Sequence, residues 1–216
     1  IVMTGTGDPV GSGLIDSLSH PGGLVTGVSQ NTAELGAKRL AILKEVLPGA
    51  TLVLLLLNGS NPSNVQAVPG RRRIAEALGI RLAVLDVHST DTDLIQALAR
   101  AAPGGADGLA VAADTLFLVA LRTRLVKLAA QARLPAIYFS REFVDAGGLM
   151  AYGPNLITLY RRAAYFVDLL LNGRNSADLP VEQPTVFEFV VNRTTLQSLG
   201  LDLPQTLLPL VTDWVV

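Results

Sequence analysis

Short apolar runs alternate along the chain with longer segments in which apolar residues recur every three or four positions. The runs have the length of strands, and the periodic segments have the spacing of one buried helix face. The longest run, "TLVLLLL" at 51–57, has no alternating polar positions, as expected of a strand buried on both faces. Repeated strand–helix units of this kind predict an α/β fold with doubly wound parallel sheets.

The expected elements follow one another in chain order. Strands are predicted at 1–5, 24–29, 51–58, 81–87, 108–114, 135–140, 148–153 and 185–192. Helices are predicted at 13–19, 31–47, 62–78, 90–101, 116–132, 155–172 and 192–200. The segment "VPG" at 68–70 should kink or break the helix predicted at 62–78, because proline removes a backbone N–H and clashes with the preceding turn. Asn31, Asn155 and Asn192 are predicted as N-caps, since an asparagine oxygen can accept from the free N–H groups of a first helical turn.

Composition removes several classes of function. Half of the residues are hydrophobic, 16% are charged and the net charge is −1, so the chain has no electrostatic footprint for nucleic acid, and no nucleic-acid partner is expected. There is no cysteine, which excludes disulfides and thiolate catalysis. No apolar run reaches the length of a membrane span. The chain starts with "IVM" inside an expected strand, so we expect a fragment that lacks upstream elements and any export signal.

A glycine-rich loop, "TGTGDPVGSG" at 4–13, follows the first expected strand and raises the possibility of a phosphate site. A Walker loop would need a lysine, and none lies nearby. The dinucleotide fingerprint would need a third glycine at Val10, and Asp8 inside the loop would repel a pyrophosphate. The loop therefore favours a close approach to some other ligand, at the edge of an α/β sheet where ligands usually bind.

Polar residues gather after four expected strands, at the end where parallel sheets bind ligands. These candidate binding residues are Thr6, Asp8 and Pro9; Asn58, Ser60 and Asn64; Asp114 and Thr115; and Arg141 and Glu142. The segment "NGSNPSN" at 58–64 precedes a helix start, whose free N–H groups suit a small carboxylate. An ordinary capped turn explains the same segment without a ligand.

The charged candidates also leave two interpretations open. Asp114 could pair with a ligand ammonium group or cap the next helix. Arg141 and Glu142 could hold a ligand or pair with each other at the surface. His20 and His88 have no partner spacing for a metal site or a catalytic triad, so neither a metal nor a cofactor is expected, and enzyme activity is not predicted.

Five long stretches resemble ABC transporter substrate-binding proteins of the tryptophan/aromatic amino-acid-binding type. They are "DPVGSGLIDSLSHPGGLVTGVS", "LGAKRLAILKEVLPGA", "LPAIYFSREFVDAGGLMAYGPNL", "YRRAAYFVDLLLNG" and "ADLPVEQPTVFEFVVNRTTLQSLGL". The resemblance covers nearly the whole chain in order. It implies a type I periplasmic-binding-protein-like fold, with two doubly wound lobes joined by a hinge and with the first lobe incomplete here. Residues 1–30 and 155–182 would be the remnant of the first lobe, and residues 31–154 and 183–216 the second lobe.

The resemblance also implies a function. A small amino acid or carboxylate would bind between the lobes and be delivered to an ABC permease in the membrane by a monomeric periplasmic protein. Asn58, Ser60 and Asn64 would take the ligand carboxylate and Asp114 its amino group, so Asp114→Ala is expected to weaken binding with little change in melting temperature. The loops holding Asp8 and Glu142 would supply the remaining contacts.

Two other classes stay open. An α/β enzyme, either a transferase or a nucleotide-dependent enzyme, could use the opening glycine-rich loop, but it would need basic residues or metal-binding carboxylates there. The effector-binding domain of a transcription regulator shares the expected fold, and it would need a helix-turn-helix upstream of Ile1.

Overall fold

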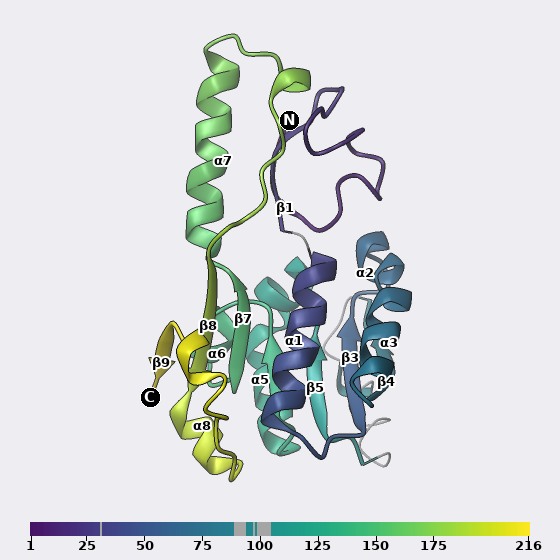
Figure 1. Cartoon of the computed structure of the whole chain (residues 1–216), viewed down its shortest axis with the longest axis vertical. Coiled ribbons are helices and arrows are strands. Elements are labelled where there is room, and N and C mark those ends of the chain that lie inside the picture. The colour runs from purple at the N-terminus through teal and green to yellow at the C-terminus, as the bar shows by residue number, and fades with distance from the viewer. Residues whose placement is uncertain (31, 89–93, 97, 99–104) are drawn as a thin grey trace. The chain divides into compact units, whose positions relative to one another are not determined.

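The computed structural model of the chain describes residues 1–30, 32–88, 94–96, 98 and 105–216 (Figure 1). The chain divides into two compact units. Unit 1 comprises Ile1–Ala33 and Pro154–Phe187, and unit 2 comprises Glu34–Gly153 and Glu188–Val216. The chain therefore passes between the units three times. The assignment of the two units to the lobes of a binding protein stays a prediction.

Unit 1 contains a small parallel sheet and one long helix. Its elements are β1 (Val2–Thr6), β2 (Thr26–Ser29), α7 (Leu156–Leu171) and the 3-10 turn η3 (Ser176–Asp178). β1 pairs in parallel with β2, and α7 packs against both strands. Leu159 and Phe166 of α7 are buried together with Val28 of β2. The predicted cap of α7 is confirmed, because Asn155 Oδ1 accepts from the backbone N–H of Thr158 at 2.9 Å.

The helix predicted at 13–19 is wrong. Gly13 has a φ of +71°, in the left-handed region, which does not continue a helix. The N–H groups of Asp16 and Ser17 donate forward to the carbonyls of Pro21 and His20, whereas a helix would require them to donate back along the chain. The segment therefore forms successive turns, and its apolar residues do not line one helix face.

Unit 2 is built on a sheet whose strands lie in the order β4-β3-β5-β6-β7-β8-β9 within the described residues. The strands are β3 (Leu52–Leu57), β4 (Arg81–Asp86), β5 (Gly108–Val111), β6 (Ala136–Tyr138), β7 (Met150–Pro154), β8 (Phe187–Asn192) and β9 (Asp213–Val215). β3 pairs in parallel with β4 and β5, β5 with β6, β6 with β7, and β8 with β9. β9 was not predicted from the sequence.

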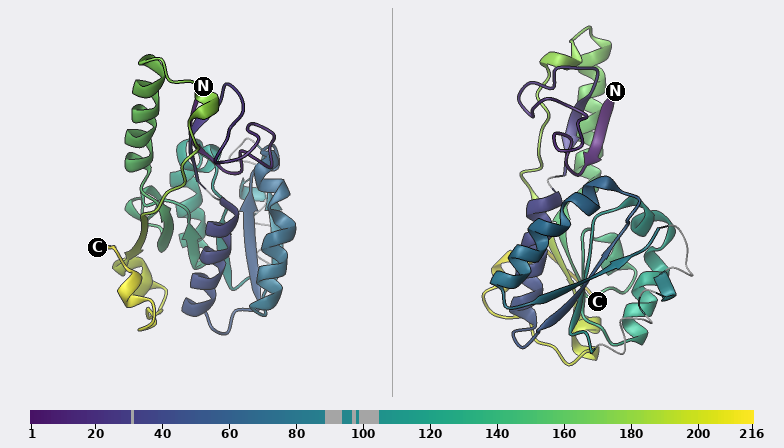
Figure 2. Two further views of the ribbon diagram at one scale, coloured as in Figure 1. Left: turned by 45° about the horizontal axis from the view of Figure 1, so that its top comes forward. Right: turned by 90° about the vertical axis from the view of Figure 1, so that its right-hand side faces the viewer.

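Helices flank this sheet on both faces (Figure 2). They are α1 (Thr32–Val46), α2 (Pro62–Gln66), α3 (Val68–Ala77), the π-helical segment η2 (Leu116–Ala120), α5 (Arg122–Gln131), α6 (Glu142–Asp145), α8 (Arg193–Ser198) and the 3-10 turn η4 (Leu208–Leu210). The helix predicted at 62–78 is broken, and Ala67 separates α2 from α3, with Pro69 in the first turn of α3. The Asn31 cap and the start of the helix predicted at 90–101 lie outside the described residues. None of the described helices has the length and apolar character to cross a membrane.

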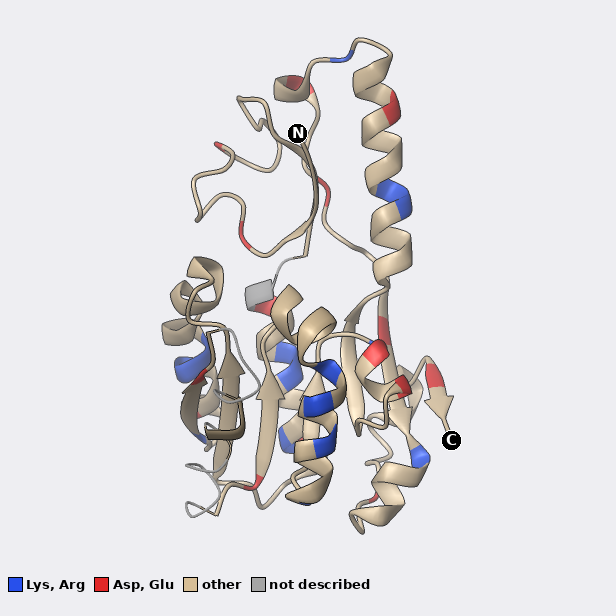
Figure 3. Ribbon diagram, turned by 180° about the vertical axis from the view of Figure 1, so that it is seen from behind, with Lys and Arg blue, Asp and Glu red and all other residues tan. Residues whose placement is uncertain are grey.

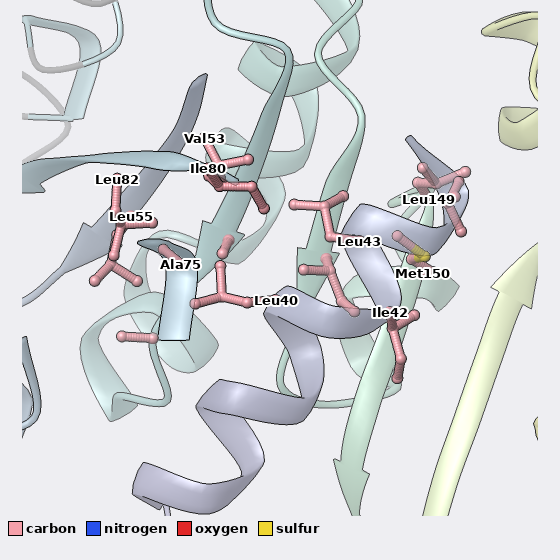
Figure 4. Packing of buried hydrophobic residues seen from close by; sticks show 14 of the residues in the cluster. Leu40, Ile42, Leu43, Val53, Leu55, Ala75, Ile80, Leu82, Leu149 and Met150 are labelled. Atoms are coloured by element: carbon pink, nitrogen blue, oxygen red, sulfur yellow. The ribbon is translucent and has the colours of Figure 1, made fainter. Parts of the chain in front are cut away.

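β3 explains how one strand supports two cores. Its side chains alternate between the sheet faces, so Val53 and Leu55 join a cluster with α1 and α3, while Leu54 and Leu56 join a cluster with α5. Figure 4 shows the first cluster, in which Leu40, Ile42 and Leu43 of α1 lie among strand residues. Each buried leucine contributes about 1.5–3 kcal/mol relative to an exposed one, so the unbroken apolar run anchors both layers. The lysines and arginines lie mainly on the helices (Figure 3).

Candidate ligand-binding site

Three neighbouring strands of unit 2 end at one edge of the sheet. β3, β5 and β6 are adjacent and parallel, so the residues that follow them meet at the same edge. Asn58 follows β3 directly, Asp114 comes shortly after β5, and Ser140 comes shortly after β6. In an open α/β sheet this edge is where ligands bind, which makes it the candidate site of this unit.

The Asp114 carboxylate is the centre of the polar cluster at this edge. Its Oδ1 accepts from Asn58 Nδ2 at 3.1 Å and from the backbone N–H of Leu116 at 2.9 Å. Its Oδ2 accepts from Asn61 Nδ2 at 2.7 Å and from Asn64 Nδ2 at 3.1 Å. The structure therefore brings together three of the predicted site residues, Asn58, Asn64 and Asp114. It adds Asn61, which the sequence analysis did not select.

These contacts decide what Asp114 does in this structure. An ionised carboxylate offers about four lone-pair positions, and four protein donors fill them. Asp114 thus holds the start of η2, through Leu116, and fixes the turn after β3, through the three asparagine side chains. These contacts match the interpretation in which Asp114 caps the next helix. Each of the three asparagine amides still has a second N–H, and among the described residues only that of Asn64 has a further acceptor, the Ala113 carbonyl at 3.4 Å.

The turn at 58–64 is rigid for a local reason. Asn58 Oδ1 accepts from the backbone N–H of Ser60 at 3.0 Å, and Asn61 Oδ1 accepts from that of Ser63 at 3.1 Å. Asn61 is the N-cap of α2, and Pro62 occupies the first helical position, where its missing N–H costs nothing. The ordinary capped turn is therefore present. The same bonds aim the asparagine side chains toward the end of β5, because each oxygen is fixed by the backbone.

A second series of polar contacts extends this edge of the sheet toward β4. Ser60 Oγ lies 3.1 Å from His88 Nδ1, and His88 Nε2 lies 3.1 Å from Asp86 Oδ2. Gly59 makes room for this arrangement, since a Cβ atom there would lie 2.1 Å from a carboxylate oxygen of Asp86. Asp86 and His88 were not predicted as site residues. Their position at the end of β4, the neighbour of β3, is the signal that would have found them.

Ser140, Thr115 and Glu142 occupy the edge beside the Asp114 cluster. Ser140 Oγ donates to Glu142 Oε2 at 2.5 Å, which holds the carboxylate next to its own helix start. Thr115 is exposed, and its side chain makes no capping bond to η2. Ser140 is buried, whereas Thr115 is exposed and Glu142 is partly exposed, so these two side chains can reach a ligand from solvent.

Arg141 forms ion pairs with two aspartates. Its Nε pairs with Asp145 at 3.2 Å and its Nη1 with Asp213 of β9 at 2.8 Å. The bond to Asp213 is the main reason that the pKa of Arg141 is raised and that of Asp213 is lowered. Arg141 therefore ties α6 to the last strand and forms no pair with Glu142. The surface pair of Arg141 with Glu142 is therefore wrong, and a contact of Arg141 with a ligand stays a prediction.

The remaining candidates, Thr6, Asp8 and Pro9, lie in unit 1. The Thr6 carbonyl accepts from the Gln30 N–H at 2.9 Å at the end of the small sheet. Asp8 is exposed, and its Oδ1 accepts from the backbone N–H of Gly11 at 2.8 Å. Asp8 thus closes the glycine-rich turn on itself, and a Cβ at Gly11 would displace its carboxylate from this position. Their role toward a ligand stays a prediction.

Comparison with known proteins places the chain in a family. Residues 1–215 match the family described as ABC transporter substrate binding protein, so the chain belongs to this family. The "Tyrosine-binding protein" of Clostridioides difficile (strain R20291) is 28% identical over 201 residues, which are 93% of this chain and 57% of that protein. The chain thus spans a little over half of this curated relative.

Solved structures agree on the fold. The ABC domain of a protein from Streptococcus pneumonia, solved in complex with L-Trp, matches with a TM-score of 0.88 at 23% identity. The match covers 99% of this chain and 73% of that chain. A substrate-binding protein with adhesive properties from Clostridium difficile, in a ligand-free, open structure, matches with a TM-score of 0.69 at 25% identity. The match covers 100% of this chain and 70% of that chain. The predicted type I periplasmic-binding-protein-like fold is confirmed.

Proposed function

We propose that this protein captures an amino acid outside the cytoplasmic membrane and delivers it to an ABC permease. The observation that carries the proposal is the polar cluster around Asp114, at the ligand edge of the sheet, in a chain that belongs to the substrate-binding family. The names of the relatives favour aromatic amino acids, with L-tyrosine and L-tryptophan first. A periplasmic location, a permease partner and a monomeric state are parts of the same proposal.

The cluster suits the two charged ends of an amino acid. The second N–H groups of Asn58 and Asn61 can donate to a carboxylate, and so can the hydroxyl of the exposed Thr115. The ammonium group is attracted by the negative charges of Asp114 and Glu142. Because protein donors fill the acceptor positions of Asp114, it acts through its charge and by holding the asparagines in place. This assigns Asp114 a positioning role, which holds Asn58 and Asn61 for direct contact with the ligand.

The proposed mechanism is capture by closure. A ligand that contacts both lobes stabilises the closed state by its difference in affinity for the two states, and the closed state docks on the permease. Thr6, Asp8 and Pro9 would supply the contacts from the other lobe. No covalent step is required, which distinguishes this proposal from the enzymatic alternatives.

A thermal-shift and calorimetry series tests the ligand class. We expect L-tyrosine or L-tryptophan to raise the melting temperature, because a ligand that binds only the folded state stabilises it by mass action. Tyramine lacks the carboxylate and 3-(4-hydroxyphenyl)propanoate lacks the ammonium group, so both should bind at least tenfold more weakly than L-tyrosine. An absence of stabilisation by any of the twenty amino acids would contradict the proposal.

A pair of variants tests the site itself. Thr115→Val keeps the shape of the side chain and removes its hydroxyl, so it should weaken amino-acid binding and leave the urea midpoint within error of the parent. Thr206→Val is the matched control, because Thr206 is exposed and bonds Glu45 at 3.4 Å, far along the chain from the cluster. Equal affinity in Thr115→Val and Thr206→Val would remove Thr115 from the site.

A further inference from the structure

Two arginines are buried side by side in unit 2 without a counterion among the described residues. Arg39 of α1 is 3% exposed and Arg71 of α3 is 2% exposed. None of the three side-chain nitrogens of Arg71 has a hydrogen-bond partner there, and Arg39 Nη2 also lacks one. Neither arginine forms an ion pair in the part of the chain that the structure describes. Buried charges are normally paired, so this arrangement needs an explanation.

The two side chains are held in place by their surroundings. Arg39 Nη1 donates to the backbone carbonyl of Tyr152 in β7 at 3.0 Å. Arg71 lies against α1 at Gly36, where a Cβ atom would come within 2.9 Å of Arg71 Nε. Glycine at position 36 therefore lets the Arg71 side chain approach α1. Because each arginine has its own fixed support, the closeness of the two guanidinium groups is built into the fold.

The electrostatics of the pair are those of an uncompensated charge. Burial and, to a smaller extent, the positive charge of Arg71 together lower the pKa of Arg39 to about 9. Burial alone lowers the pKa of Arg71 to about 10. The phenol of Tyr152 is the group that acts in the opposite direction on Arg39, and its effect is the smallest of the three. A fixed negative charge between α1 and α3 would restore both guanidinium groups to their ordinary state.

We propose that Arg39 and Arg71 form an internal site for one small monovalent anion of the size of chloride. The unpaired N–H groups supply the donors, and both arginines are at most 3% exposed, so the site we propose would admit a small anion and exclude a large one. The site is separate from the polar cluster around Asp114 and does not rest on the proposed function. The bond from Arg39 to Tyr152 gives the site a structural consequence. It joins α1, which begins where the chain enters unit 2, to β7, which ends where the chain leaves it.

The first test measures thermal unfolding at constant sodium concentration while gluconate is replaced by chloride. Gluconate is too large for the site, so the exchange changes the small anion and keeps the ionic strength. The melting temperature of the parent chain should rise with chloride by about 3 °C or more once chloride exceeds its dissociation constant. An equal melting temperature in the two salts would overturn the proposal, because water molecules in place of an anion would give that result.

Matched variants locate the effect. Arg71→Met keeps an unbranched stem and removes the charge, so its melting temperature should not respond to chloride. In gluconate it should melt at or above the parent, because an unpaired buried charge has been removed. Arg73→Met makes the same change at an exposed position of the same helix and should keep the parent's response. A chloride response that survives in Arg71→Met would overturn the proposal.

A second measurement uses the parent chain without any variant. The chloride-35 resonance of the solution should broaden in the presence of the protein, and sodium formate should reverse the broadening by competition. If Arg71→Met does not fold, this measurement still decides the question. Broadening no greater than that of the same concentration of an unrelated protein of equal net charge would overturn the proposal.

Discussion

Asn61 donates its side-chain N–H to Oδ2 of Asp114 at 2.7 Å, the shortest of the four hydrogen bonds to this carboxylate. The bond joins the N-cap of α2 to the segment after β5, so two strand ends that are far apart in sequence form one polar unit. Its geometry depends on both partners, because Asn61 is itself fixed by the bond between its oxygen and the Ser63 N–H. Asp114 is therefore the residue that holds the turn at 58–64 to the start of η2.

Replacement of Asp114 by alanine should destabilise unit 2. The sequence alone led us to expect little change in melting temperature, and the four hydrogen bonds change that expectation. Four donors would lose their acceptor, and a half-buried donor left unpaired costs about 1 kcal/mol or more, so we expect a loss of about 2–3 kcal/mol in the free energy of unfolding. Urea denaturation measures it. Asp202→Ala, at an exposed position, is the control, and equal urea midpoints for the two variants would show that the bonds contribute nothing.

A charge introduced at Asn64 tests the same cluster from the other side. Asn64 is 2% exposed, and its Nδ2 lies 3.1 Å from Asp114 Oδ2. Asn64→Asp would place two carboxyl groups together in a buried position, and we expect a loss of about 3 kcal/mol in the free energy of unfolding, because like charges at this distance repel and the alternative is a carboxyl group kept neutral. The double variant Asn64→Asp/Asp114→Asn restores one carboxylate facing one amide, so it should recover at least about 1 kcal/mol. Strictly additive losses in this double-mutant cycle would mean that the pair does not interact.

The sequence predicted most of the sheet because its signals are local. The run at 51–57 has no polar position after Thr51, so β3 could be placed from the amino-acid pattern alone. The caps at Asn155 and Asn192 were equally readable, since the residue type and its place before a periodic segment are both visible in the sequence. β9 was missed because it has only three residues, too few to show a pattern, and because it pairs with β8, which lies about 20 residues earlier in the chain.

The candidate site was predicted only in part, for a related reason. Strand ends can be located from the sequence, which placed Asn58, Asn64 and Asp114 at one edge. Side-chain partners cannot, so the amides were assigned to a ligand carboxylate although Asp114 accepts a hydrogen bond from each. Arg141 shows the same limit, because its partner Asp213 is 72 positions away, on the strand that was missed. The burial of Arg39 and Arg71 was not predicted, since nothing in the local sequence marks a buried arginine.

Gly153 should be intolerant of any side chain. A Cβ atom there would lie 2.0 Å from the backbone carbonyl oxygen of Phe139, and a backbone atom cannot move aside as a flexible side chain can. Gly153→Ala should therefore destabilise the chain by about 2–3 kcal/mol. Gly49→Ala is the control, because no heavy atom lies within 4 Å of the new methyl group and the position has no positive φ. Equal melting temperatures for the two variants would contradict the packing at Gly153.

The pair of Arg162 and Glu182 should make the stability of unit 1 depend on pH in the acid range. Both Glu182 oxygens accept from Arg162, each at 2.6 Å, and this bond is the main reason that the pKa of Glu182 falls below its ordinary value of 4.5. A carboxyl group with a lowered folded-state pKa contributes stability that is present above pH 4.5 and is lost as the pH falls through the folded-state value. Both side chains are about 40% exposed, so the contribution should be about 0.5 kcal/mol.

Glu182→Gln isolates this contribution, because the backbone bonds of residue 182 to Gly27 and Ser29 are kept. The parent should be more stable than the variant at pH 7, and the difference should shrink toward zero as the pH falls below 4.5. Urea midpoints of both proteins at pH 7, 5, 4 and 3 measure it. High salt should also reduce the difference at pH 7, because salt screens the attraction between exposed charges. A difference that stays constant across this pH range would show that the carboxylate of Glu182 contributes through packing and not through its charge.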